Sequence, residues 1–116
     1  MAGPPDPNEL PNLDVEFPRL EEDSAASSPV PMSEILRYLH AEAAPDEPTE
    51  ADLQFLRTAR VEDADYWIWR YVESDGAECY VTVSRGPNGQ TMLGYEENYD
   101  RLTPEQFMLG ENHGLI

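Results

Sequence analysis

The sequence predicts an α+β domain in which helices pack on one face of an antiparallel three-stranded meander. The stretch from Tyr66 to Glu96 is the one long run of aromatic and β-branched residues in the chain, as expected for strands. Two turn signals interrupt this stretch, and segments with helical signals lie before and after it. In chain order we therefore expect a disordered N-terminal tail, two helices, three strands and a short C-terminal helix.

The turn signals fix the length of both hairpin loops. Three strands are expected, over residues 66–72, 79–83 and 91–95, and the loops between them contain Ser74-Asp75-Gly76 and Pro87-Asn88-Gly89. Each loop ends in the glycine that a type I turn with a G1 bulge places in the left-handed region. Three-residue loops predict the pairs Trp67 with Val83, Trp69 with Val81, Tyr71 with Cys79, Val83 with Leu93, and Val81 with Tyr95.

This register assigns every strand residue to one of two sheet faces, because side chains alternate along a strand. The face predicted to form the core carries Trp67, Trp69, Tyr71, Cys79, Val81, Val83, Leu93 and Tyr95. The opposite face is mixed and too apolar for a solvated surface, and it carries Tyr66, Ile68, Arg70, Val72, Tyr80, Thr82, Ser84, Met92 and Glu96. Two interpretations stay open for this second face: it docks a partner, or a helix or the N-terminal segment covers it.

Two helices are expected before the strands. The first spans about residues 34–44, with Ser33 as its N-cap and apolar residues on one stripe. The second spans residues 49–60, and Thr49 with Asp52 three residues later resembles a capping box. After the strands, Thr103 with Pro104 at the first helical position predicts a short helix that Gly110 ends after about two turns.

Residues 1–31 are expected to form the disordered tail, and residues 32–116 the single domain. The tail holds seven of the eleven prolines and seven acids against one arginine, so it is too polar to bury itself. Within it, Leu13, Val15 and Phe17 alternate with acidic residues. Such a segment is suited to add as a strand to a sheet edge of this protein or of a partner. The alternative is a few apolar residues in a solvated tail.

The formal net charge is −17, and all seven basic residues are arginine. Direct binding to nucleic acid is not expected, because its affinity comes from basic side chains that contact phosphates. Anionic membrane surfaces are disfavoured for the same reason. A strongly negative field instead favours a basic protein partner. The alternative is that the acids serve solubility or adaptation to a saline cytoplasm, with no partner implied.

The chain offers little for catalysis or metal binding. Its one cysteine, Cys79, allows no internal disulfide, and the start of the chain has no leader, so a reducing cytoplasm is the expected location. No apolar stretch approaches the roughly 20 residues of a membrane span. Zinc needs three or four Cys or His ligands, and Cys79, His40 and His113 are widely separated. We expect no catalytic site, no metal and no cofactor.

These observations favour a small, acidic, non-enzymatic protein-binding module of adaptor, inhibitor or immunity type that docks a basic partner. Three alternatives stay open: a nucleic-acid mimic that acts on a DNA-binding protein, a recruitment factor that binds through the tail, and a small enzyme that uses carboxylates. The partner and the oligomeric state stay open as well. The candidate binding residues are Tyr66, Ile68, Arg70, Tyr80 and Met92 with Trp67 and Trp69 as anchors, and Leu13, Val15 and Phe17 in the tail.

Overall fold

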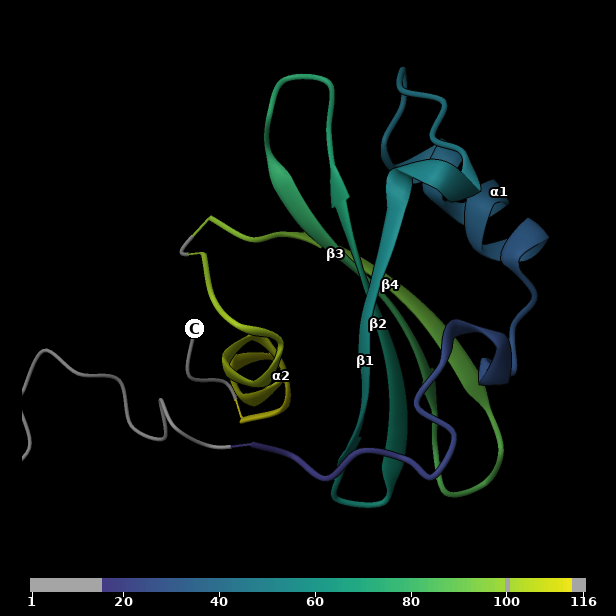
Figure 1. Ribbon diagram of the computed structural model, residues 1–116, viewed down its shortest axis with the longest axis vertical. Helices are drawn as coiled ribbons and strands as arrows, with labels where there is room; N and C mark the ends of the chain where they lie inside the picture. The colour runs from purple at the N-terminus through teal and green to yellow at the C-terminus, as the bar shows by residue number, and fades with distance from the viewer. Residues whose placement is uncertain (1–15, 100, 114–116) are drawn as a thin grey trace, which may run out of the picture.

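The computed structural model describes residues 16–99 and 101–113, and its centre is one four-stranded antiparallel sheet in the order β1-β2-β3-β4 (Figure 1). The α+β class is confirmed, with one strand more and one helix fewer than expected. Two short 3-10 turns, η1 (Ala25–Ser27) and η2 (Glu50–Asp52), complete the described elements. The longer elements are α1 (Met32–Glu42), β1 (Leu53–Val61), β2 (Ala64–Val72), β3 (Glu78–Arg85), β4 (Thr91–Glu97) and α2 (Pro104–His113).

The predicted register of the three central strands is confirmed. In the structure Trp67 pairs with Val83, and Trp69 with Val81, across the first hairpin. Across the second hairpin, Val83 pairs with Leu93. Gly76 and Gly89 end the two loops with φ values of 91° and 81°, the left-handed conformation that glycine adopts without a steric penalty. The loop length therefore decides which side chains face each side of the sheet.

The predicted second helix over residues 49–60 is wrong. The capping box between Thr49 and Asp52 is present, but it opens only the 3-10 turn η2. Residues 53–61 then form β1, antiparallel to β2, with a register shift between Phe55 and Arg57. Strand alternation places Leu53 and Phe55 against one core and Leu56 against the other, and the bulge brings Ala59 onto the same face as Leu56. It thereby produces the three-residue apolar spacing that resembles a helix in the sequence.

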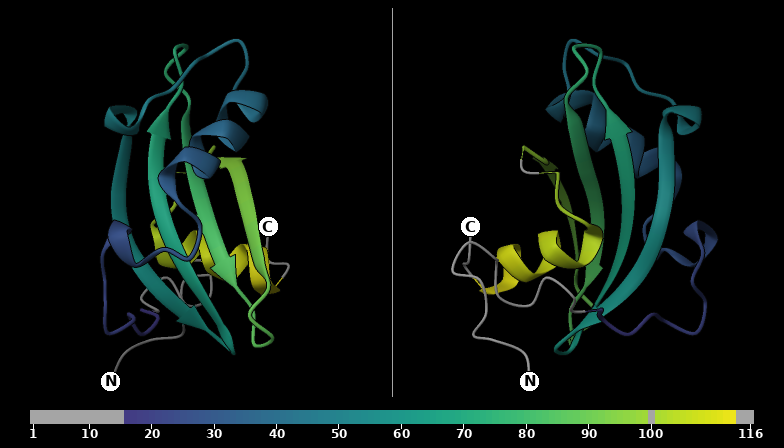
Figure 2. Two further views of the ribbon diagram at one scale, coloured as in Figure 1. Left: turned by 90° about the vertical axis from the view of Figure 1, so that its right-hand side faces the viewer. Right: turned by 60° about the vertical axis from the view of Figure 1, so that its left-hand side comes forward.

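The two helices lie on opposite faces of the sheet, and not on one face as expected (Figure 2). On the α1 face, Ile35 and Leu39 are buried with the predicted core residues of the strands, including Trp67, Trp69 and Val81. On the α2 face, Ile68, Tyr80, Phe107 and Met108 form a second buried cluster. The rings of Tyr80 and Phe107 meet edge to face with centroids 4.7 Å apart. The sheet is therefore the middle layer of three.

Both helices begin close to their predicted positions, but their caps and ends differ in part from the prediction. In α2 the amide of Thr103 donates to Gln106 Oε1 at 3.0 Å, and the amide of Gln106 donates to Thr103 Oγ1 at 3.2 Å. This reciprocal pair confirms the predicted start. The helix continues to His113, so Gly110 does not end it. In α1 the N-cap residue is Pro31 and not Ser33, and the helix ends at Glu42.

Residues 16–31, which we expected to belong to the tail, pack against the domain. The amide of Arg60 donates to the carbonyl of Pro18 at 2.7 Å, and the amide of Thr58 donates to Asp23 Oδ1 at 2.6 Å. These bonds satisfy two outward amides at the edge of β1. Val30 is buried in the α1-face core. Residues 1–15, with Leu13 and Val15, lie outside the described residues.

Arg57 joins three parts of the fold. Its side chain is only 4% exposed and forms an ion pair with Glu105 at the start of α2. Its guanidinium also donates to the carbonyl of Phe17 in the N-terminal segment. Its Nε donates to the carbonyl of Thr58 in β1 at 2.7 Å. One buried cation therefore holds α2 and the N-terminal segment against β1.

We predict that Arg57→Ala lowers the free energy of unfolding by about 3–5 kcal/mol, because it leaves Glu105 without its buried partner. Urea denaturation followed by circular dichroism measures the loss. Arg19→Ala is the control, because Arg19 is 53% exposed and its pair with Asp23 is 3.3 Å long. Its expected cost is at most about 1 kcal/mol. Equal losses in the two variants would contradict the role of Arg57.

We also predict that the fold loses stability between about pH 10 and pH 12. Burial raises the pKa of Tyr71 to about 12, helped by its hydrogen bond to Asp46, and burial raises the pKa of Tyr80 to about 12. Unfolded tyrosines titrate near pH 10, so the contribution of these phenols is complete below about pH 10 and falls as the pH rises toward 12. Urea midpoints measured from pH 8 to 12 follow this loss. Tyr71→Phe should make the slope shallower, and an unchanged slope would contradict the assignment.

Candidate functional site

The structure places four of the seven candidate binding residues of the sheet in its interior. Trp67 and Trp69 are buried beneath α1. Ile68 and Tyr80 are buried beneath α2, so a helix covers this part of the second face. The side chains that stay accessible are those of Tyr66, Arg70 and Met92, of which Met92 is 67% exposed. A binding role for these residues stays a prediction.

The tail motif is described only at its end. Phe17 is half-buried and packs against the α2-face core. Its neighbour Pro18 accepts the hydrogen bond from the outer edge of β1. This end of the motif therefore borders a sheet edge of the protein itself. A role of Leu13, Val15 and Phe17 in recruiting a partner stays a prediction.

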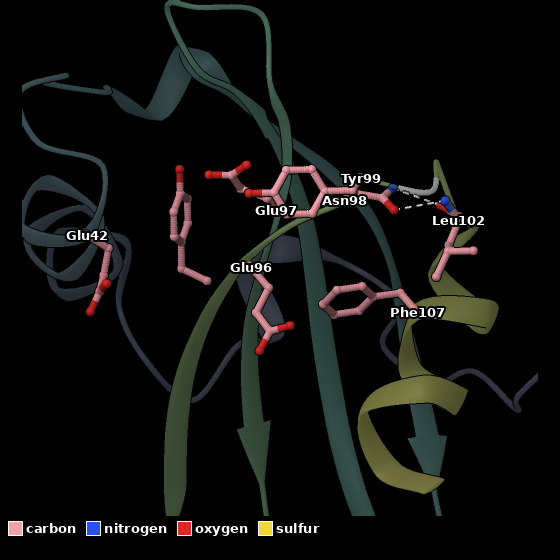
Figure 3. Close-up of a pocket in the computed structure, with 8 residues that line it drawn as sticks. Glu42, Glu96, Glu97, Asn98, Tyr99, Leu102 and Phe107 are labelled. Atoms are coloured by element: carbon pink, nitrogen blue, oxygen red, sulfur yellow. Dashed lines mark hydrogen bonds between the residues drawn. The ribbon is translucent and has the colours of Figure 1, made fainter. Parts of the chain in front are cut away.

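A groove of about 430 Å³ lies at the C-terminal end of β4 (Figure 3). We call it the β4 groove. It extends from α1 on one side to α2 on the other, with the end of β4 between them. It is lined by Glu42, Tyr95, Glu96, Glu97, Asn98, Tyr99, Leu102 and Phe107.

Hydrogen bonds of Asn98 hold the wall of the β4 groove in place. The amide of Asn98 donates to the carbonyl of Glu78 at 2.8 Å, which extends the pairing of β4 with β3 by one step. The Asn98 side chain donates to the carbonyl of Leu102 at 3.0 Å and accepts from the amide of Leu102 at 2.8 Å. The hydroxyl of Tyr80 also donates to the carbonyl of Leu102. The connection from β4 to α2 is thus fixed at both ends.

Tyr99 is the most exposed aromatic side chain of the groove, at 81%. It lines the β4 groove and also a smaller hollow of about 220 Å³ between the β2–β3 loop and Arg101. A hydrogen bond to Glu97 raises the pKa of Tyr99, and the charge of Glu97 adds to this effect. An aromatic ring that projects between two hollows is suited to contact a partner side chain.

The electrostatics of the β4 groove are negative. Glu42, Glu96 and Glu97 line it, and no ion pair among the described residues neutralises them. Burial raises the pKa of Tyr38 on α1, and the charges of Glu42 and Glu96 add to the shift. Five of the seven arginines pair with carboxylates elsewhere: Arg19, Arg57, Arg60, Arg70 and Arg85.

Cys79 lies near the groove but has no access to it. The thiol is fully buried, 3.1 Å from Glu73 Oε1 and 3.2 Å from the hydroxyl of Tyr95. Burial raises the pKa of Cys79 to about 12, so the reactive thiolate is scarce at neutral pH. In the part of the chain that the structure describes, no group of three or more His, Cys, Asp or Glu side chains converges to hold a metal ion.

The comparisons with known proteins give no family for this chain. The sequence matches no protein-family model, no curated protein is significantly similar to it, and no solved structure matches its fold significantly. Among the described residues, no helix is both long enough and apolar enough to cross a membrane. The functional argument therefore rests on the geometry and charge of the β4 groove.

Proposed function

We propose that the protein is a small acidic binding module, without enzymatic activity, that docks a basic partner protein of the kind an adaptor, inhibitor or immunity protein recognises. The observation that carries this proposal is the β4 groove, whose lining combines Glu42, Glu96 and Glu97 with the exposed ring of Tyr99. Basic side chains of a partner placed there would be attracted by these carboxylates, and one of them could stack on Tyr99.

This proposal moves the binding site from the middle of the second sheet face to the end of β4. Met92, on the same strand, stays within reach of a partner that occupies this side of the sheet. The negative field of the whole chain would steer a basic partner toward the protein and speed the encounter. A nucleic-acid mimic would need acids spaced along an elongated face. The acids of the β4 groove are clustered instead, and this favours a partner with a compact basic epitope.

The test compares two triple variants with the same net charge. In the groove variant, Glu42→Gln, Glu96→Gln and Glu97→Gln remove the three carboxylates. In the control variant, Glu21→Gln, Glu47→Gln and Glu50→Gln remove three exposed acids from other parts of the surface. Tagged full-length proteins are incubated with nuclease-treated extract of the native cells at low and at high salt.

We expect wild type and control to retain a basic partner at low salt and to release it at high salt, because screening weakens exposed charge pairs. The groove variant should retain at least about tenfold less partner, since three opposite charges at the contact are lost. Equal retention by both triple variants would show that overall charge, and not the groove, attracts the partner. If both triple variants retain as much partner as the wild type at low and at high salt, the proposed function is contradicted.

A further inference from the structure

The two edges of the sheet differ in how they are closed. At the β1 edge, the amides of Thr58 and Arg60 donate to Asp23 and to Pro18 of the N-terminal segment. At the other edge lies β4, which Figure 2 shows as the outermost strand. Among the described residues, no segment other than β3 forms a backbone hydrogen bond with β4. The chain itself therefore closes the β1 edge at Thr58 and Arg60, whereas the β4 edge is open.

The hydrogen-bond pattern identifies the open groups of β4. Asn98 bonds with Glu78 at one end of the β3–β4 ladder, and Gly86 bonds with Gln90 at the other. Hydrogen-bonded pairs alternate with non-bonded pairs in an antiparallel ladder, so every second residue between these ends faces β3. The residues between them direct their N–H and C=O groups outward, and they are Thr91, Leu93, Tyr95 and Glu97.

Apart from the two acids at its end, β4 lacks the usual features that protect an edge strand. Its seven residues contain no proline and no lysine, and its pairing with β3 has no register shift. Regular, open edges of this kind pair readily with another strand. The residues Met92 to Tyr95 are uncharged, whereas Glu96 and Glu97 form an acidic end beside Glu42.

We propose that the outer edge of β4 binds an extended basic segment of the partner as a fifth strand, with two consecutive basic residues opposite Glu96 and Glu97. Neighbouring residues of a strand point to opposite faces. One basic side chain would therefore lie on the α1 face beside Glu42, and the next on the α2 face. This inference rests on the proposed function and adds pairing of the backbones to the attraction of charges.

A second copy of this chain is a poorer occupant of the same edge. Each copy has a formal net charge of −17, so two copies repel each other before their edges can meet. A segment with adjacent arginines or lysines instead neutralises the acidic end of β4. Charge complementarity thus selects a basic strand over self-association.

The test uses a synthetic peptide as long as β4, seven residues, with the sequence Arg-Arg-Val-Thr-Val-Thr-Val. In an antiparallel arrangement its two arginines lie opposite Glu97 and Glu96. Its first, third, fifth and seventh residues then bond with the outward groups of β4. Two methylated forms separate backbone pairing from charge. N-methylation of the third and fifth residues blocks the bonds to β4, and N-methylation of the fourth and sixth residues blocks only groups that face away.

Fluorescence anisotropy of labelled peptides with the full-length protein measures binding. We expect the peptide methylated on the pairing side to bind at least about tenfold more weakly than the peptide methylated on the far side, because two backbone bonds are lost. Equal binding of the two peptides would overturn strand addition and leave the charge-based proposed function standing. Absence of binding by all forms would also overturn strand addition, whereas the groove variant and its control test the proposed function separately.

A variant of the protein gives a second measurement. Thr91→Pro removes an outward N–H from an exposed position of an edge strand, where proline is tolerated. We expect Thr91→Pro to weaken binding of the unmethylated peptide about threefold or more relative to Thr91→Ala, which keeps the N–H. Equal affinities would overturn pairing at this position. A dimer of the wild-type protein in analytical ultracentrifugation that Thr91→Pro abolishes would assign the edge to a second copy and overturn the basic strand.

Discussion

The fold depends on one buried cation, the guanidinium of Arg57. It lies on β1 and reaches α2 through Glu105 and the N-terminal segment through the carbonyl of Phe17. A guanidinium suits this position because its planar fork donates in several directions at once and stays charged at every physiological pH. Replacing it by an apolar residue would leave the half-buried carboxylate of Glu105 and the carbonyl of Phe17 without this partner. The ion pair thereby couples three segments that are far apart in the sequence.

This anchoring leaves one side of the sheet uncovered. With α2 held on one face, α1 packed on the other and residues 18–23 bonded to the edge of β1, three sides of the sheet are occupied. The fourth side is the edge of β4, and the β4 groove lies at its end. This side therefore combines free backbone groups of β4 with carboxylates for which no ion pair is described. The proposed function places the partner at this side for that reason.

The sequence predicted the central hairpins well because local chemistry determines them. A glycine at a fixed position sets the loop length, and the loop length sets the register. β1 was missed because its bulge gives apolar residues a helical spacing. The packed N-terminal segment was missed because the hydrogen bonds of Asp23 and of the Pro18 carbonyl produce no apolar pattern. Its apolar contacts, through Phe17 and Val30, are divided between the two cores and show no period in the sequence. The β4 groove could not be predicted from the sequence, because only the tertiary fold brings Glu42 together with Glu97. The one local signal was Tyr99, an aromatic residue that follows two acids at the end of a strand.

Hydrogen exchange of individual amides, measured by NMR on the free protein at low concentration, tests the central claim most directly. If one edge is closed and the other open, the amides of Thr58 and Arg60 exchange slowly, while those of Leu93 and Tyr95 exchange much faster than their neighbours Gly94 and Glu96. This alternation along β4, together with protection along the edge of β1, is the predicted result. Equal protection of Leu93, Tyr95, Gly94 and Glu96 in a monomer would show that the β4 edge is covered and would contradict the account.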